Sequence, residues 1–397
     1  RTDINEVVKV LKSNFLTQGE EVPKFEKKVR AKVRAKFSVA VNSATSALHI
    51  ACMSLNIKKG DIVWTSANSF VASINCANYL NAKIDFVDID LETYNLSIDS
   101  LEKKLKKAKQ SKKLPKVLIL VHFAGLPCDL KKIWMLSKKY NFKIIEDASH
   151  AIGSKYRGDY IGNCRYSDIA IFSFHPVKII TSGEGGMCLT NSKKIYKDLL
   201  LYRSHGITKD KQQFQIKRNK NNEWYYEQQK IGYNYRLSDI HASLGRSQLE
   251  KLDKFIKIRN QIARKYKILL KDLPLILPKD NKLSLSSYHL YVVRTQVSSD
   301  KKLHKKLFDF LRKKKIWCNL HYIPIYKHPY YKNKFNKKNF INSEIYYNSA
   351  ISIPIFPGLT NKQIMYVKNT FIEFFNKNSI KKKHKKILFL TGLPSSG

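Results

Sequence analysis

One lysine of this lysine-rich chain is set apart by its neighbours. Lys178 lies in the segment FSFHPVKIITSGEGG, between an apolar run and a glycine-rich turn. A lysine that follows a strand is usually a surface charge. A lysine held away from water can instead act as a nucleophile or a base, because burial lowers the pKa of its amine.

Two further polar residues follow apolar runs. Asp147 ends the run FKIIED, and Ser173 lies five residues before Lys178. In an open parallel sheet, ligands gather at the carboxyl ends of the strands. A lysine that bonds to an aldehyde and a carboxylate that pairs with a pyridine nitrogen are the two groups that pyridoxal 5′-phosphate (PLP) requires. Alternatively, Asp147 could cap a helix that begins in the stretch DASHA.

Two turns could complete such a site. The stretch VNSATSALH predicts a strand, a turn and a helix whose cap is Asn42 or Ser43. Its first amides would face a phosphate at the positive end of the helix, although an ordinary capped helix fits the pattern as well. Phe70 follows another strand and could either stack on a flat ring or lie in the core. The amides that would face the phosphate are those around Ala44, Thr45 and Ser46.

Short apolar runs alternate with amphipathic stretches through the first 240 residues, which predicts a mainly parallel α/β sheet with helices around it. From about Asp239 the pattern changes to one long helix and then to a mixed segment. We therefore expect a large domain over residues 1–249 and a smaller α+β domain over 250–378. The expected strands are residues 38–42, 62–66, 83–89, 116–123, 142–147, 169–174 and 186–190.

The composition excludes several classes of protein. A formal net charge of +43 would suggest nucleic acid, but the basic runs at 101–113 and 301–315 place apolar residues at helical spacing and lysines on the other face. We expect solvated helix faces there and no nucleic-acid partner. No apolar run is long enough to span a membrane. The six cysteines lack metal-ligand spacing, so we expect no metal, and reduced thiols in the cytoplasm.

The last residues form a separate segment. Residues 379–397 combine a basic linker with ILFLTGLPSSG, where Gly392 and Gly397 have the G-x-x-x-x-G spacing of a phosphate-binding P-loop. This stretch resembles the start of a P-loop kinase domain, although a disordered apolar tail is the alternative. The start at Arg1 and the glycine end suggest that both ends were cut from a longer chain.

Seven ordered segments, spread over residues 2–378, resemble motifs of the sugar-nucleotide aminotransferases of the DegT/StrS type. That family consists of PLP enzymes of fold type I, so the resemblance implies a mainly parallel seven-stranded sheet and a smaller C-terminal α+β domain. The segments are LKSNFLTQG, NSATSALH, EDASHAIGSKY, FSFHPVKIITSGEGG, YRSHG, GYNYRLSDIHASLGRSQL and HYIPIYKHPYY.

The resemblance also implies roles for individual residues. Lys178 matches the lysine that bonds to PLP, Asp147 the partner of the pyridine nitrogen, and His150 a residue beside the cofactor ring. Phe70 matches the stacking aromatic, and Ser173 and the turn Ala44-Thr45-Ser46 match phosphate contacts. Asn234 matches an asparagine that reaches the phosphate from a neighbouring subunit, which implies a homodimer with shared active sites. Contacts to the nucleotide sugar are implied for Asn14, Phe15, Leu16, Thr17, Asn319, Leu320, His321 and Tyr322.

The family chemistry is transfer of an amino group from L-glutamate to the C4 ketone of a nucleotide-linked 4-keto-6-deoxy sugar. The segments NFLTQG and HYIPIY favour a sugar of the UDP-4-keto-6-deoxy-N-acetyl-L-altrosamine type, as in pseudaminic acid synthesis. Precursors of GDP-perosamine or UDP-bacillosamine are alternatives. Some relatives are sugar dehydratases with histidine in place of the lysine, and Lys178 argues against that class.

Overall fold

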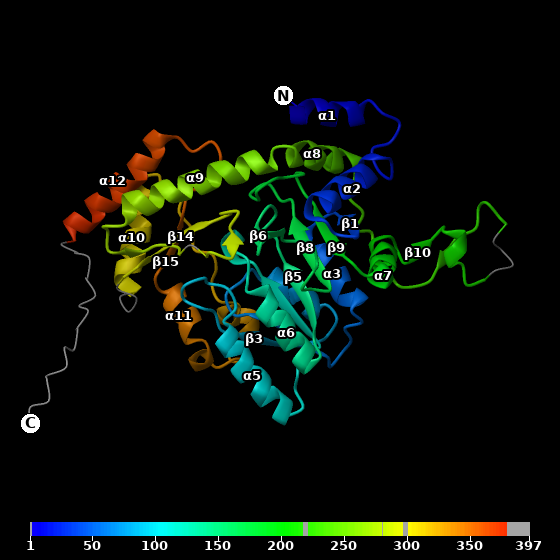
Figure 1. The fold of residues 1–397 in the computed structure, drawn as a ribbon, viewed down its shortest axis with the longest axis horizontal. Coiled ribbons are helices and arrows are strands. Elements are labelled where there is room, and N and C mark those ends of the chain that lie inside the picture. The colour runs from blue at the N-terminus through cyan, green and yellow to red at the C-terminus, as the bar shows by residue number, and fades with distance from the viewer. Residues whose placement is uncertain (1, 217–220, 280, 297–300, 379–397) are drawn as a thin grey trace, which may run out of the picture.

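The computed structural model describes residues 2–216, 221–279, 281–296 and 301–378, and Figure 1 shows their arrangement. The linker and P-loop-like segment expected at residues 379–397 lie outside this part of the chain. Among the described residues, no helix combines the length and the apolar character needed to cross a lipid bilayer.

A seven-stranded sheet forms the centre of the molecule, with the strand order β1-β9-β8-β5-β4-β2-β3. All seven predicted strands are present, with ends shifted by two residues at most. β9 runs antiparallel to both of its neighbours, and the other pairs are parallel. The strands are β1 (Phe37–Val41), β2 (Ile62–Ser66), β3 (Lys83–Val87), β4 (Val117–Val121), β5 (Lys143–Asp147), β8 (Ile169–Ser173) and β9 (Gly186–Thr190).

Helices cover both faces of this sheet. α2 (Glu21–Val33), α5 (Ile98–Gln110) and α6 (Leu130–Tyr140) pack into one apolar core, and α3 (Ala44–Ser54), α4 (Ala72–Asn78) and α7 (Lys193–Arg203) into the other. The apolar face of α5, with Leu101 and Leu105, is buried and packs the helix against the sheet. This helix carries the lysines of the basic run. The expected amphipathic helix is therefore confirmed.

The long helix expected from about Asp239 is two helices, α8 (Asp239–Leu249) and α9 (Leu252–Leu270), so that expectation was wrong. Glu250 and Lys251 separate them, and the Lys251 amide donates to the Gln248 carbonyl in a tighter turn. Beyond the break, α9 packs with α10 (Lys301–Lys313) and α12 (Asn361–Lys377) around a small sheet in a core of its own. That sheet has the order β12-β14-β15, with β12 (Leu275–Ile276), β14 (Tyr291–Thr295) and β15 (Ala350–Ile353).

One C-terminal segment does not stay with this smaller core. Ile325, Tyr326, Tyr331 and Phe340 pack into the core of the large sheet, and the Tyr331 hydroxyl accepts a hydrogen bond from Asn78 at 2.8 Å. The segment contains the short helices Ile325–Lys327, Pro329–Tyr331 and Lys337–Asn339, followed by α11 (Ile341–Tyr347). The stretch just before it, residues 319–322, is therefore fixed next to the large sheet.

A hairpin-like arm extends away from the body beside α7 (Figure 1). It is built on β10 (Ile207–Thr208) and β11 (Glu227–Gln228), which pair antiparallel, and on the short helix Lys211–Gln213. Trp224, Tyr226 and Ile231 of this arm are exposed large apolar side chains. The remaining short elements are the helix Phe123–Gly125 and a small sheet of β6 (Lys155–Tyr156), β7 (Asp159–Tyr160) and β13 (Ser284–Leu285).

A buried carboxylate helps to hold the N-terminal segment. Asp239, at the start of α8, accepts hydrogen bonds from the amides of Gly19 (2.7 Å), Glu21 (2.8 Å) and Val22 (3.1 Å). Asp239 is distant in sequence from α2, but it accepts from N–H groups at the start of that helix that have no partner within the helix. The preceding helix α1 (Thr2–Leu11) packs on α8 as well.

Candidate active site

Three neighbouring strands end at one cavity of about 290 Å³. Val121, Asp147 and Ser173 are the last residues of β4, β5 and β8, and all three line it. This is the edge of a parallel sheet at which ligands bind. Nine of the predicted site residues meet there: Ala44, Thr45, Phe70, Asp147, His150, Ser173, Lys178, His321 and Tyr322.

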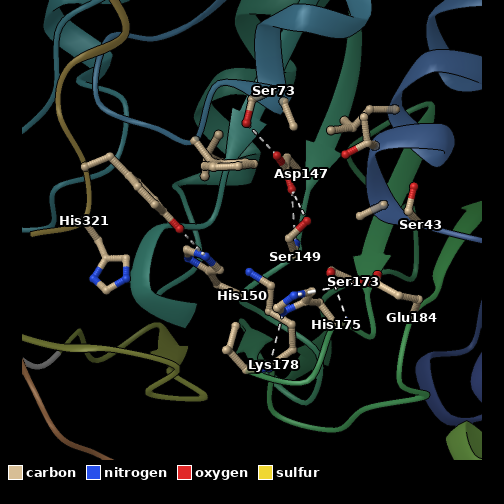
Figure 2. A pocket seen from close by; sticks show the side chains of 18 residues that line it. Ser43, Ser73, Asp147, Ser149, His150, Ser173, His175, Lys178, Glu184 and His321 are labelled. Carbon is tan, nitrogen blue, oxygen red and sulfur yellow. Dashed lines mark hydrogen bonds and ion pairs between the residues drawn. The ribbon is translucent and has the colours of Figure 1, made fainter. Parts of the chain in front are cut away.

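The Lys178 amine points into this cavity from the loop between β8 and β9 (Figure 2). The loop is held by the Lys178 amide, which donates to the His175 carbonyl at 2.9 Å, and by the Ser182 amide, which donates to the Phe174 carbonyl at 2.9 Å. Burial lowers the pKa of Lys178 to about 8, while the charge of Asp147 acts in the opposite direction. Lys178 is therefore not a surface charge, and its amine is partly neutral near physiological pH.

Asp147 is fixed by two serines before any ligand is considered. The Ser73 hydroxyl donates to Oδ2 at 2.7 Å, and the Ser149 hydroxyl and amide donate to Oδ1 at 2.6 Å and 3.2 Å (Figure 2). Among the described residues, no helix begins directly after Asp147, because the next element is the strand β6. The helix-cap alternative was therefore wrong, and the carboxylate is free to pair with a cation in the cavity.

The start of α3 forms the opposite wall. Ser43 caps the helix, and its hydroxyl accepts a hydrogen bond from the Ser46 amide at 3.1 Å. The amides of Ala44 and Thr45 precede the first intrahelical hydrogen bond and lie at the cavity. The start of β9 packs closely against the start of α3 because residue 186 is glycine. A Cβ at this position would lie 2.5 Å from the Ser43 carbonyl group. Ser46 itself is outside the lining.

Histidines and a tyrosine occupy a third side. His150 Nε2 lies 3.2 Å from the Tyr322 hydroxyl, and the His150 ring centroid lies 4.3 Å from that of His289. Burial, and then the charges of Lys178 and His321, hold the pKa of His150 well below its usual value. Burial and the charge of Lys178 lower the pKa of His321 to about 4. Both imidazoles are therefore neutral at pH 7.

Phe70 belongs to the cavity and not to the core. Its side chain is 55% exposed, and its ring centroid lies 5.7 Å from that of Tyr322. An aromatic face in this position can cover a flat ligand ring. The alternative of a core aromatic is thereby excluded.

The other predicted site residues lie elsewhere. Asn319 lines a neighbouring groove, and Leu320 packs in a small core between the two sheets. Asn234 is exposed at the base of the arm, where it bridges to Ser204. The segment of Asn14, Phe15, Leu16 and Thr17 is an exposed loop, joined to α8 through a bridge from Thr17 to Ser238.

Several side chains of the cavity were not expected from the sequence. Ser149 could have been found, because a serine two residues after an aspartate commonly forms such a turn. Ser73 could not, since it is 74 positions from its partner Asp147. His175 and Glu184 also line the cavity, and their side chains approach to 3.8 Å across the loop that holds Lys178.

These residues fit PLP. The buried amine of Lys178 and the fixed carboxylate of Asp147 are the two charged partners that PLP requires, and the start of α3 offers amides to its phosphate. The cavity is close to the lower end of the size of ligand pockets, roughly 300–1,000 Å³. Within the described ranges, no group of three or more His, Cys, Asp or Glu side chains could hold a metal ion.

Comparison with known proteins agrees with this geometry. Residues 1–372 match the DegT/DnrJ/EryC1/StrS aminotransferase family. The chain is 35% identical over 380 residues to the UDP-4-amino-4,6-dideoxy-N-acetyl-beta-L-altrosamine transaminase of Campylobacter jejuni. The matched region covers 95% of this chain and 96% of that protein.

Solved structures show the same architecture. PseC of Helicobacter pylori, an aminotransferase involved in the biosynthesis of pseudoaminic acid, superposes with a TM-score of 0.84 at 28% identity, over 95% of this chain and 97% of its own. Spr1654 of Streptococcus pneumoniae, solved in its PMP form, gives a TM-score of 0.85 at 27% identity over the same shares.

Proposed function

The chain belongs to the DegT/DnrJ/EryC1/StrS aminotransferase family, and from this premise we propose that it transfers the amino group of L-glutamate to the C4 ketone of a nucleotide-linked 4-keto-6-deoxy sugar. The PLP-dependent sugar aminotransferase activity is that of the family. The observation that carries the proposal is the buried amine of Lys178 in one cavity with Asp147.

PLP supplies an aldehyde carbon that receives nitrogen, and a ring that stabilises negative charge on the carbon that loses a proton. We propose that Lys178 holds this carbon covalently and that Asp147 holds a proton on the pyridine nitrogen. The amides of Ala44 and Thr45, with Ser173, bind the phosphate, and Phe70 and His150 lie beside the ring. Asp147 can do this because the serines that donate to it leave its negative charge in place.

Lys178 is also the group placed to move protons. Once free, its Nζ accepts the proton from the α-carbon of glutamate and later returns a proton to the sugar carbon that receives nitrogen. Burial favours this role, because a neutral amine accepts protons and an ammonium does not. The neutral histidines His150 and His321 leave Lys178 as the main basic group on this side of the cavity.

For the sugar we propose the UDP-4-keto-6-deoxy-N-acetyl-L-altrosamine type, giving the 4-amino sugar for pseudaminic acid or a related surface glycan. Two observations support this choice: the similarity to the Campylobacter transaminase and the structural likeness to PseC. His321 and Tyr322, expected from the resemblance to contact the sugar, line the cavity beside Lys178.

We further propose a homodimer with shared active sites, in the cytoplasm. The support is the position of Asn234, which is exposed beside a projecting arm and does not line the cavity of its own chain. The arm carries exposed apolar side chains, including Trp224 and Ile231, that a second copy would cover. We also propose that the exposed Asn14–Thr17 loop contacts the sugar.

The test is an amination assay of the purified chain with L-glutamate and a panel of UDP-, GDP- and dTDP-4-keto-6-deoxy sugars. We expect turnover with the UDP-linked N-acetyl sugar, and a visible absorption that Lys178→Ala removes. Lys27→Ala is the matched control, since Lys27 is an exposed lysine. An absence of turnover on every sugar, from protein that carries PLP, would refute the proposal.

A further inference from the structure

The main chain of His150 is held by a segment that is distant in sequence. The Ser287 hydroxyl donates to the His150 carbonyl at 2.7 Å, and the Ser287 amide donates to the Ser154 hydroxyl at 3.0 Å. Ser287 is fully buried and precedes β14, the middle strand of the smaller sheet. Its hydroxyl fits there because residue 125 is a glycine with a φ of +90°, and a Cβ on that residue would lie 2.2 Å from the Ser287 oxygen. The position of His150 in the cofactor cavity therefore depends on the segment before β14.

The same segment packs a second imidazole against His150. The ring centroids of His150 and His289 lie 4.3 Å apart, with an angle of 41° between the rings, and both residues are buried. His150 Nε2 lies 3.2 Å from the Tyr322 hydroxyl, whereas its Nδ1 has no hydrogen-bond partner within the described ranges. One hydrogen bond leaves a ring free to tilt about that bond, so the packed face of His289 restricts the orientation further. His289 also lines the neighbouring groove and thus lies between that groove and His150.

A buried arginine holds the backbone of His289. Arg259 donates through Nη1 to the carbonyls of Ile355 at 2.8 Å, Tyr288 at 3.0 Å and His289 at 3.4 Å. Burial lowers the pKa of Arg259 to about 10, so its guanidinium remains positive at pH 7. Burial, and then neighbouring groups that are positive when protonated, hold the pKa of His289 well below its usual value; these groups are His150, Lys178, Arg259 and His321. Both imidazoles of the stacked pair are therefore neutral at pH 7.

We propose that His289 is a positioning residue for the reaction, because its ring fixes the His150 imidazole beside the cofactor and keeps water away from it. The inference rests on the proposed function, which places the PLP ring beside His150. His289 does not line the cofactor cavity, so it acts through His150. A hydrated His150 would regain a pKa near the usual value of about 6.5 and, when protonated, would disfavour a second positive charge on Lys178.

The first test uses the full-length protein without PLP and measures deuterium exchange at the imidazole Cε1 of each histidine by mass spectrometry across a pH series. This exchange reports the pKa and the hydration of each ring separately. His289→Ala should speed exchange at His150 and raise its pKa toward about 6.5, whereas His289→Phe, which keeps a flat ring in contact, should change neither. Ser287→Ala removes only the hydroxyl that donates to the His150 carbonyl, and should also speed exchange at His150.

His304→Ala is the matched control for this substitution. His304 lies on α10, where its Nε2 is 2.8 Å from the Ala350 carbonyl, and it does not line the cofactor cavity. We expect exchange at His150 and turnover to equal those of the wild type in this variant. Faster exchange at His150 in His304→Ala as well would show a general loosening of the fold and would overturn the specific role of His289.

Turnover gives the second readout. We expect kcat of His289→Ala to be roughly ten- to a hundredfold below that of the wild type, while His289→Phe keeps most of it. The ratio of the two kcat values, His289→Ala to wild type, should fall further as the pH falls through about 6.5, because His150 is then protonated in the variant alone.

Unchanged exchange at His150 in both His289→Ala and Ser287→Ala would overturn the positioning role, as would an equal loss of turnover in His289→Ala and His289→Phe. If His289→Ala does not fold, Ser287→Ala and His289→Phe still decide the question. A wild-type protein that binds PLP but does not react with glutamate would instead refute the proposed function, and exchange in the PLP-free protein would still show whether His289 holds His150.

Discussion

At the scale of single residues, the environment of Lys178 separates it from the many other lysines of the chain. Four lysines of α5 are exposed, whereas Lys178 projects into a cavity whose lining is largely apolar; the four are Lys103, Lys106, Lys107 and Lys109. Removal from water disfavours the ammonium form. Its reactivity therefore follows from burial, and nothing in the overall composition would reveal it.

We predict that Lys178 of the PLP-free protein reacts with acetic anhydride with a pH midpoint of about 8. The pKa is lowered, so the reactive neutral amine is gained as the pH rises through about 8, whereas a lysine with the usual pKa gains it only near about 10.4. Lys27, an exposed lysine, serves as the reference. Peptide-resolved labelling by mass spectrometry measures both in one sample. Identical midpoints for the two lysines would contradict the assignment.

A second residue-scale prediction concerns Asp147. Asp147→Asn keeps the size and removes the charge: its side-chain oxygen can still accept from Ser149, and its NH2 can donate to the Ser73 hydroxyl. We therefore expect kcat to fall by roughly 10²- to 10³-fold with little change in thermal stability. Asp99→Asn, on an exposed turn of α5, is the control. If Asp147→Asn retained wild-type turnover, the carboxylate would have no role in holding the proton of the cofactor.

At the scale of elements, apolar pattern and turn residues predicted much of the fold. All seven strands of the large sheet were found, and Ser43, one of the two residues expected to cap α3, does cap it, because buried strands and capped helices leave local signals. The break between α8 and α9 left no local signal in the sequence, since every residue around Glu250 suits a helix. The contact of Ser73 with Asp147, and the return of residues 325–340 to the large core, depend on tertiary packing that spacing along the chain does not encode.

The Asp239 contact gives a prediction at this scale. Asp239→Ala leaves the amides of Gly19, Glu21 and Val22 without their acceptor, so we expect the free energy of unfolding to fall by about 2 kcal/mol. Urea denaturation measures the loss, and hydrogen exchange should show faster exchange of these three amides. Asp253→Ala, which removes an exposed ion pair with Lys32, should change stability by less than about 1 kcal/mol. Equal effects of the two substitutions would contradict this role of Asp239.

At the scale of the whole molecule, a shared active site predicts complementation between two inactive variants. Lys178→Ala and Asn234→Ala should each lose most activity as homodimers. When the two are unfolded and refolded together, roughly half of the dimers are mixed, and each mixed dimer has one complete site, so we expect about a quarter of wild-type activity. Measurement of kcat after co-refolding checks this. Recovery of no activity would show that Lys178 and Asn234 of the same chain serve one site.

The two serines that hold Asp147 have a further consequence. Ser73 and Ser149 orient the Asp147 carboxylate before PLP binds. The entropy cost of ordering this carboxylate is therefore part of folding and not of PLP binding. The acid is preorganised, so more of the interaction energy is available as affinity. Since a ligand that binds only the folded state stabilises it by mass action, the melting temperature should rise with the concentration of free PLP. The supply of PLP would then determine the temperature at which the enzyme unfolds.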